Sequence, residues 1–219
     1  FKTKADFIEN YDQPLMNLPY VVDREQRRIL CQSTACLAHI GRSIGMFGSN
    51  DIESSKCEEL LCEIYDLRHP FIAFAYNSGG SADEAKEAFG KIAGILKKLE
   101  AYLKIEAKNN GGQKVCHLVG GKFSAPDFHL FELLDQNSAA AKKLEISDDL
   151  LGEYPHLKAF KEGFEKLDEN QFYLSSWLHE GLPFNNCVAK VASALDVGLY
   201  KRGQAAEWRG KGEITMNGS

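Results

Sequence analysis

NLPYVVDREQRRILCQSTACLAHI, residues 17–40, is the stretch that decides the fold. It predicts a strand at 18–23, a polar turn, a second strand at 27–31 and a helix that begins near Ser33. The apolar residues that follow Ser33 recur at helical spacing. A β-hairpin followed by a helix is therefore expected near the start of the chain.

The same stretch also has features of a binding site. Pro19 cannot donate to a strand ladder, so it is expected at a strand start or edge, where the backbone groups of Leu18 can pair with an extended peptide. The start of the helix at Ser33 presents N–H groups that suit a carboxylate. These features predict a receptor for a short acidic peptide. The alternative is a buried hairpin in which Gln32 and Ser33 only cap the helix.

Composition places the chain among soluble globular proteins. Its 219 residues are 44% hydrophobic and 26% charged, enough for one large domain or two small ones. The net charge of -5 argues against nucleic acid as the main partner. No apolar run reaches the roughly 18 residues that a membrane helix needs, so no membrane span is expected.

Cysteine usage predicts the cytoplasm or another reducing compartment. The six cysteines have no CxxC or zinc-like spacing, and the histidines are scattered singly, so no metal site is expected. Cys31 and Cys36 are five residues apart, as are Cys57 and Cys62. All four are predicted on helices as small core residues.

After the turn at 48–51 the pattern becomes helical. We predict a partial α/β domain at 1–48, an all-helical domain at 49–199 and a tail at 200–219 that lacks apolar periodicity. The expected helices cover 51–76 (with a kink at Pro70), 82–108, a segment from Ser124, a segment from Tyr154, and 172–179.

Ser124-Ala125-Pro126-Asp127 is the strongest local helix start in the chain. Ser124 can cap the helix, Asp127 three residues on can bond back to it, and Pro126 lies in the first turn, where its missing N–H does no harm. Ser124 and Asp127 are therefore interpreted as a folding signal and not as a catalytic pair.

The motif of residues 17–23, followed nine residues later by Gln-Ser-Thr-Ala at 32–35, resembles the glutathione-binding motif of cytosolic glutathione transferases. The nearest classes are mu and sigma-like, and the likeness extends to about residue 190. The resemblance implies a mostly α protein. Its partial thioredoxin-like domain, a β-hairpin plus a helix, precedes the all-α C-terminal domain of that family.

The resemblance also implies the binding roles of individual residues. Leu18 would give main-chain bonds to the cysteinyl part of glutathione, with Pro19 in the cis form. Gln32 and Ser33 would hold the γ-glutamyl carboxylate at the helix start. Asp66 would reach across a dimer to the γ-glutamyl ammonium of the neighbour's ligand.

Three further residues receive weaker roles. Arg68 would stand beside Asp66 at the dimer interface, and Leu15 would occupy the place of an aromatic dimer key. Tyr76 would line the pocket for the second substrate. Without the family, Asp66 and Arg68 are an ordinary pair on a helix surface.

The group that would activate the glutathione thiol is not found in this sequence. The first strand, first helix and second strand of the family domain have no counterpart, and the activating Tyr or Ser belongs to that first strand. Tyr11 and Tyr20 are the nearest hydroxyls, but neither occupies the motif position. Because the chain begins at Phe1, we expect either a removed leader or a fragment.

Three functions follow as hypotheses. The first is a glutathione transferase that conjugates the glutathione thiolate to electrophiles, provided that the missing amino-terminal segment exists. The second is a non-catalytic interaction subunit of a larger assembly, with a homodimer partner or another chain completing the sheet. The third is a glutathione-dependent isomerase or peroxidase on the same scaffold. In each, glutathione is the expected small-molecule partner.

Overall fold

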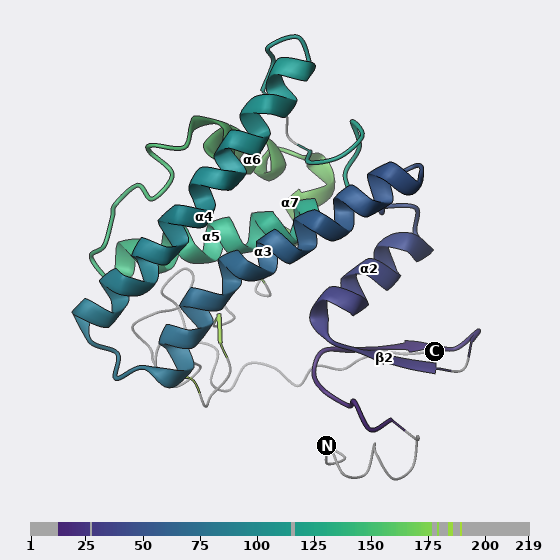
Figure 1. Cartoon of the computed structure of the whole chain (residues 1–219), viewed down its shortest axis with the longest axis horizontal. Helices are drawn as coiled ribbons and strands as arrows, with labels where there is room; N and C mark the ends of the chain where they lie inside the picture. The colour runs from purple at the N-terminus through teal and green to yellow at the C-terminus, as the bar shows by residue number, and fades with distance from the viewer. Residues whose placement is uncertain are drawn as a thin grey trace. The chain divides into compact units, whose positions relative to one another are not determined.

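The computed structural model describes residues 13–26, 28–114, 117–176, 179, 184, 185 and 189 (Figure 1). Tyr11, the tail at 200–219 and part of the helix predicted at 172–179 lie outside the described residues. The elements are β1 (Tyr20–Asp23), β2 (Arg28–Cys31), α2 (Ser33–Ser43), α3 (Asp51–Asn77), α4 (Ala82–Asn109), α5 (Ala125–Lys143), α6 (Pro155–Glu165) and α7 (Asp168–Leu174).

The predicted hairpin and helix are confirmed. β1 and β2 pair antiparallel, with Tyr20 opposite Cys31 and Asp23 opposite Arg28. The Asp23 side chain accepts the N–H of Gln26 at 2.9 Å and so closes the turn between the strands. β1 begins at Tyr20, two residues after the predicted start at residue 18. The reason is that Pro19 has no N–H to donate to the ladder. α2 packs against both strands.

The chain divides into two compact units. The hairpin unit comprises residues 1–65 and 117–129, and the helical unit comprises 66–116 and 130–219. α3 and α5 each contribute to both. The domain boundaries given above from sequence stay predictions.

The predicted bond from Asp127 back to Ser124 at the start of α5 is present and fully buried. The Asp127 carboxylate, 0% exposed, accepts the backbone N–H of Ser124 at 2.6 Å and its hydroxyl at 2.7 Å. It also accepts the N–H of Leu118 at 2.6 Å. Burial away from water raises the pKa of Asp127 to about 7, although the bonds from Ser124 and Leu118 act in the opposite direction.

This raised pKa predicts a pH-dependent stability. An unfolded aspartate titrates near pH 3.9, so between about pH 4 and 7 the native Asp127 holds a proton that the unfolded chain has released. The contribution of Asp127 to the free energy of unfolding therefore falls as the pH rises through that window. Asp127→Asn, which does not titrate, should be less stable than wild type, and its deficit should shrink by about 1–3 kcal/mol from pH 5 to pH 7.5. Urea unfolding at the two pH values measures this, and a deficit that grows with pH would contradict it.

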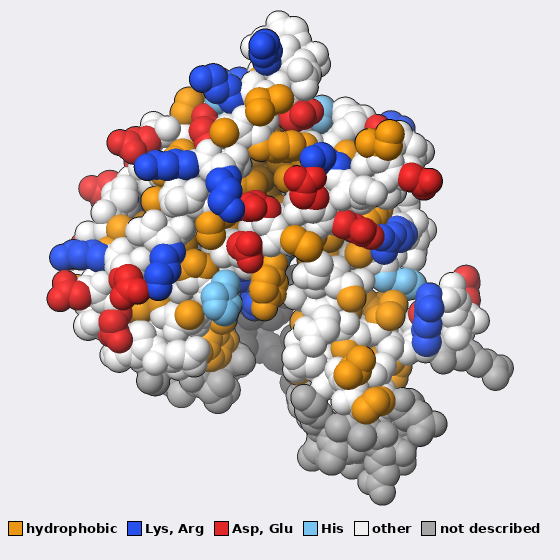
Figure 2. All heavy atoms as spheres, in the orientation of Figure 1, with side chains coloured by type: hydrophobic (Ala, Val, Ile, Leu, Met, Phe, Trp, Pro, Cys, Tyr) orange, Lys and Arg blue, Asp and Glu red, His pale blue; other side chains and the backbone are white. Residues whose placement is uncertain are grey.

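The helical unit is built on amphipathic helices. α4 begins with an exposed capping box of Ser81 and Glu84. Its outer face carries ion pairs such as Lys91 with Glu87, and Figure 2 shows acidic and basic side chains interspersed over the visible face. The inner face of α4 is buried at helical spacing through Ala85, Ala88, Phe89, Ile92, Leu96, Leu99, Leu103 and Ala107. Burying a large apolar side chain contributes about 1.5–3 kcal/mol to stability, and the buried face of α4 is therefore the main source of its stability.

Aromatic residues complete the core of the helical unit. The rings of Phe131 on α5 and Phe164 on α6 stack with their centroids 4.6 Å apart, and both are buried. Phe71 and Phe89, from α3 and α4, meet edge to face at 6.4 Å. Such pairs add about 0.5–1.5 kcal/mol beyond the burial of their area.

α6 receives its cap from a distant helix. The residue before it, Tyr154, makes no side-chain cap bond. Instead the Glu100 carboxylate of α4 accepts the backbone N–H groups of His156 at 3.0 Å and Leu157 at 2.9 Å, and contacts His156 Nδ1 at 2.7 Å. A negative charge at this end of α6 also complements its dipole, so Glu100 fixes α6 against α4.

The structure bears on two further sequence expectations, the kink at Pro70 and the placement of the cysteines. α3 runs unbroken through Pro70, and a kink there stays a prediction. The prediction that all four paired cysteines are core residues on helices is wrong for two of them. Cys31 lies in β2, although it is buried, and Cys62 on α3 is exposed, whereas Cys57 is buried. Five residues along a helix amount to a rotation of about 140°, so Cys57 and Cys62 face different sides.

Within the described ranges, no helix combines the length and the low polarity that crossing a membrane requires.

Candidate functional site

The hairpin register brings the two halves of the sequence motif together. Because Tyr20 pairs with Cys31, the residues that precede β1, Leu18 and Pro19, lie at the same end of the hairpin as Gln32 and Ser33, which follow β2. The Leu18–Pro19 peptide bond is cis, as the resemblance implied. Leu18 is 76% exposed and lies just before the first paired residue of β1.

Gln32 is the residue before α2 and has an unusual backbone. Its φ is 75° and its ψ 123°, values that residues other than glycine rarely adopt. Its side chain is exposed and makes no cap bond to the described part of α2. Such conformations persist only where the surroundings hold them, and they concentrate at binding sites. The first turn of α2 is therefore left with backbone donors that no side-chain cap occupies.

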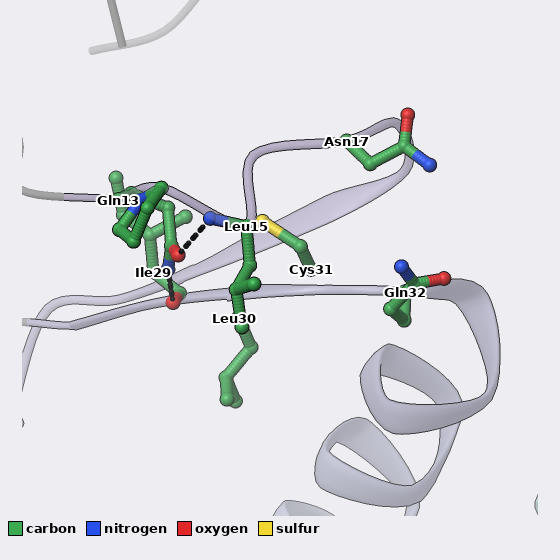
Figure 3. A pocket seen from close by; sticks show the side chains of 8 residues that line it. Gln13, Leu15, Asn17, Ile29, Leu30, Cys31 and Gln32 are labelled. Atoms are coloured by element: carbon green, nitrogen blue, oxygen red, sulfur yellow. Dashed lines mark hydrogen bonds between the residues drawn. The ribbon is translucent and has the colours of Figure 1, made fainter. Parts of the chain in front are cut away.

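A pocket of about 330 Å³ opens beside this turn (Figure 3). It is lined by Gln13, Pro14, Leu15, Asn17, Ile29, Leu30, Cys31 and Gln32. In Figure 3 the side chains of Asn17 and Gln32 lie at one end of the group, where the chain leaves β2 for α2. The pocket therefore combines an apolar wall with three carboxamides, those of Gln13, Asn17 and Gln32, a composition suited to a small polar ligand.

Gln13 holds the segment that forms the other wall of the pocket. Its Nε2 donates to the Ile29 carbonyl at 2.6 Å, and its Oε1 accepts the N–H of Leu15 at 3.2 Å. These bonds attach the segment before the motif to the outer edge of β2. Leu15, predicted as a dimer key, is 74% exposed and lines the pocket.

The Cys36 thiol near the site is unsuited to nucleophilic chemistry. Burial, reinforced by the nearby Cys31, raises the pKa of the Cys36 thiol. Cys36 Sγ donates to the carbonyls of Leu30 at 3.5 Å and Pro19 at 3.7 Å. A protonated, hydrogen-bonded thiol is a structural group, and here it ties the first turn of α2 to the proline.

The remaining predicted site residues lie on α3, in the helical unit. Asp66 is exposed, and Arg68 and Tyr76 are half-buried. Their roles at a dimer interface and in a second-substrate pocket stay predictions, as do the ligand contacts of Leu18, Pro19, Gln32 and Ser33. Of the two hydroxyls considered for catalysis, Tyr20 lies in β1 with 36% of its surface exposed.

Of the eight residues that line the pocket, sequence reasoning singled out Leu15 and Gln32 and missed the other six, among them Asn17, Gln13 and Cys31. Asn17 belongs to the quoted motif and could have been found from it, because its amide directly precedes Leu18. Gln13 and Cys31 gave no local signal, since their places depend on contacts across the hairpin. Among the described residues, no cluster of three or more His, Cys, Asp or Glu side chains is arranged to hold a metal ion.

The family model, the two relatives and the solved structure compared below are all described as glutathione S-transferases. A family model described as glutathione S-transferase, C-terminal domain, matches residues 65–177. Glutathione S-transferase Mu 5 of Mus musculus is 31% identical over 179 residues, which cover 82% of this chain and 72% of the relative. Glutathione S-transferase Mu 3 of Homo sapiens is 29% identical over 180 residues with the same coverage. The solved pi-class glutathione S-transferase of Onchocerca volvulus matches with a TM-score of 0.66 at 23% identity, covering 86% of this chain and 85% of that one.

The fold is thus that of a protein with part of a thioredoxin-like domain, here a β-hairpin and α2, followed by an all-α domain. The family model spans more than half of the sequence, and the mouse relative is about one-third identical. The chain belongs to the cytosolic glutathione transferase family, with mu-class and pi-class proteins among its relatives.

Proposed function

We propose that this chain binds glutathione at the end of the hairpin where Leu18 and Pro19 meet Gln32 and Ser33. The main-chain groups of Leu18 pair with the cysteinyl part of the ligand. Its γ-glutamyl carboxylate binds the start of α2, where Gln32 and Ser33 and the dipole end of the helix supply donors. The observation that carries the proposal is the hairpin register, which brings both halves of the motif to one edge.

We further propose that the chain acts as a glutathione transferase when a strand with an activating hydroxyl completes the sheet. A free thiol is mostly protonated at pH 7, so conjugation to an electrophile needs such a group. The described part of the sheet has two strands, with β1 paired on one side only. The alternative is a non-catalytic member of an assembly, in which a partner strand occupies that edge without supplying the hydroxyl.

The binding proposal predicts a specific loss in Ser33→Ala. Removing a hydroxyl that bonds a carboxylate costs about 1.5–3 kcal/mol, so the affinity for glutathione should fall about ten- to hundredfold. Isothermal titration with glutathione measures the change. Ser43→Ala is a matched control, because it removes the same hydroxyl from the other end of α2, where Ser43 bonds only the His39 carbonyl. Equal losses in both variants would overturn the assignment of Ser33.

Catalysis is tested separately on wild type. Conjugation of glutathione to an electrophilic dinitrobenzene would support the transferase. Binding without turnover would support the non-catalytic alternative, and absence of binding would refute both.

A further inference from the structure

Two buried thiols hold the exposed segment 17–19 at its two ends. Just before the segment, Met16 is only 4% exposed, and its Sδ accepts the Cys31 thiol at 3.7 Å. At the end of the segment, the Pro19 carbonyl accepts the Cys36 thiol at 3.7 Å. The residues of the segment itself are exposed. Side chains of β2 and α2 therefore anchor the chain on both sides of Leu18.

Cys36 also joins the two halves of the motif. Its backbone N–H donates to the Gln32 carbonyl at 2.9 Å, which is the first hydrogen bond of α2. Its Sγ lies 3.7 Å from the carbonyl oxygen of Pro19 and 3.5 Å from that of Leu30. Both carbonyls can only accept, so the one hydrogen of the thiol is shared between them. One residue thus contacts the proline and the start of the helix together.

The ladder of the hairpin does not fix segment 17–19. The first paired residue of β1 is Tyr20, and Pro19 has no N–H to donate. The side chain of Leu18 is 76% exposed, so its packing adds little. The contacts of the two thiols therefore restrain a stretch of backbone that the strand pairing leaves out.

We propose that Cys31 and Cys36 are positioning residues for glutathione, an inference that rests on the binding function proposed above. Cys31 holds the chain before Leu18, and Cys36 holds the chain after it. Both act through the backbone, and they keep the main-chain groups of Leu18 at a fixed distance from the donors of Gln32 and Ser33. A ligand that bonds both halves at once depends on that distance, because the groups of a binding site must be held to within about 0.5 Å.

The test is isothermal titration of the full chain with glutathione, comparing Cys36→Ala with Cys36→Ser. Ala removes the donor to Pro19, so the affinity should fall about two- to tenfold, as expected for one weak hydrogen bond. Ser keeps a small donor at the same place, so it should bind glutathione more tightly than the Ala variant does. This rescue identifies the hydrogen bond, since a role in filling space alone would not distinguish the two variants by affinity.

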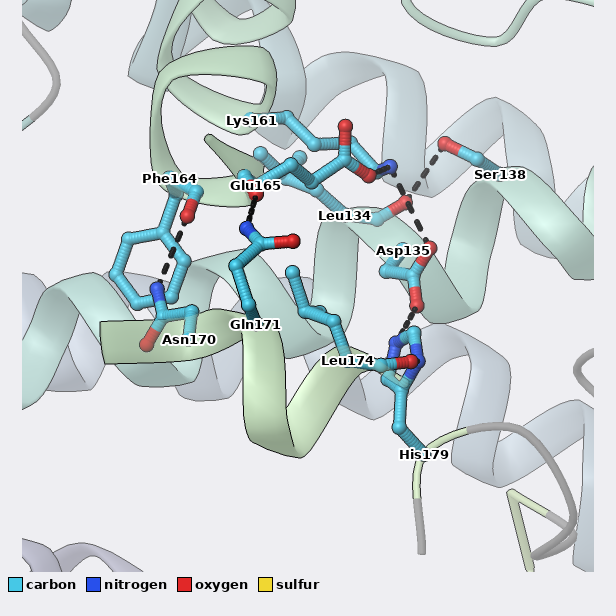
Figure 4. A network of polar contacts seen from close by, with 10 residues as sticks. All are labelled: Leu134, Asp135, Ser138, Lys161, Phe164, Glu165, Asn170, Gln171, Leu174 and His179. Atoms are coloured by element: carbon cyan, nitrogen blue, oxygen red, sulfur yellow. Dashed lines mark hydrogen bonds and ion pairs between the residues drawn. The ribbon is translucent and has the colours of Figure 1, made fainter. Parts of the chain in front are cut away.

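Two control variants lose comparable contacts elsewhere. Cys57→Ala removes a thiol that is 0% exposed, on the part of α3 that belongs to the hairpin unit. Asn170→Ala removes a side-chain donor to the Phe164 carbonyl, 2.9 Å away, in the helical unit (Figure 4). Both should lower the free energy of unfolding and leave the affinity for glutathione unchanged. An affinity loss in Cys57→Ala as large as that in Cys36→Ala would refute the positioning role.

A measurement without ligand separates the positioning from the proposed function. The amide NMR signals of Asn17 and Leu18 should shift in Cys31→Ala and in Cys36→Ala, and should stay in place in Cys57→Ala. Unshifted signals in both thiol variants, or wild-type affinity for glutathione in both, would overturn the inference. If these signals shift but wild type does not bind glutathione, the proposed function fails and the anchoring of the segment stands.

Discussion

Asp127→Ala is expected to lower the free energy of unfolding by about 3–5 kcal/mol. The variant removes the acceptor of three hydrogen bonds of 2.6–2.7 Å, from the N–H and hydroxyl of Ser124 and the N–H of Leu118. The Ser124 hydroxyl can turn to another acceptor, but the two backbone N–H groups cannot. Each buried N–H left without a partner costs about 1–3 kcal/mol. Urea unfolding followed by circular dichroism measures the loss.

Glu84→Ala is the matched control for this prediction. Glu84 occupies the same position in the box of α4. It accepts the N–H of Ser81 at 3.0 Å, the hydroxyl of Ser81 at 2.7 Å and the N–H of Gly79 at 3.0 Å. These bonds are exposed, so water replaces them and the expected loss is about 0.5–1 kcal/mol. If the two variants lose the same free energy of unfolding, burial does not explain how strongly Asp127 stabilises the start of α5.

The comparison of these two boxes indicates which parts of the structure the sequence can predict. The spacing of Ser124 and Asp127 is local, so it predicts the box directly. The equally regular spacing of apolar residues in α4 predicts that helix to within one residue at its end. The hairpin could be predicted for the same reason, because two short apolar runs flank a polar turn.

What the sequence did not predict depends on contacts between distant residues. Glu100 lies 56 residues before His156, and no pattern in either segment indicates that the side chain of one caps the helix of the other. The pocket wall formed by Gln13 has the same origin, since its bond to Ile29 joins residues 16 apart. α7 covers Asp168–Leu174 and so starts four residues before the predicted start at 172, because Asp168 and Glu169 in the first turn suit a helix start that the apolar pattern did not reveal.

In the candidate site, too, some residues could be predicted from a sequence pattern and others could not. Leu18, Pro19, Gln32 and Ser33 could be grouped from the sequence because the two segments that hold them flank a β-hairpin, which brings them to one end. Their contacts with a ligand stay predictions. Asp66 and Tyr76 were assigned through the resemblance alone, because nothing in the local pattern of α3 distinguishes them from the other residues of that helix.

Gly48→Ala should destabilise the hairpin unit by about 2–5 kcal/mol, through two additive effects. Gly48 has a φ of +80°, which costs a residue with a Cβ about 1–2 kcal/mol. A Cβ there would also lie 2.6 Å from the backbone of Glu53 and Ser54, in the first turn of α3, and overpacking of this kind costs about 1–3 kcal/mol. That turn cannot move away cheaply, because Glu53 Oε2 accepts the N–H of Ser49 at 2.6 Å and the Ser54 hydroxyl donates to the Phe47 carbonyl at 2.8 Å.

Gly45→Ala separates the two effects, because Gly45 has a similar φ of +72° but nothing within 4 Å of the added Cβ. It should therefore lose only the conformational part, about 1–2 kcal/mol. Thermal and urea unfolding of the two variants give the difference, which is the cost of the crowding alone. A Gly48→Ala protein as stable as Gly45→Ala would mean that the start of α3 yields to the methyl group. In that case the bonds of Glu53 and Ser54 do not hold the turn rigidly against Gly48.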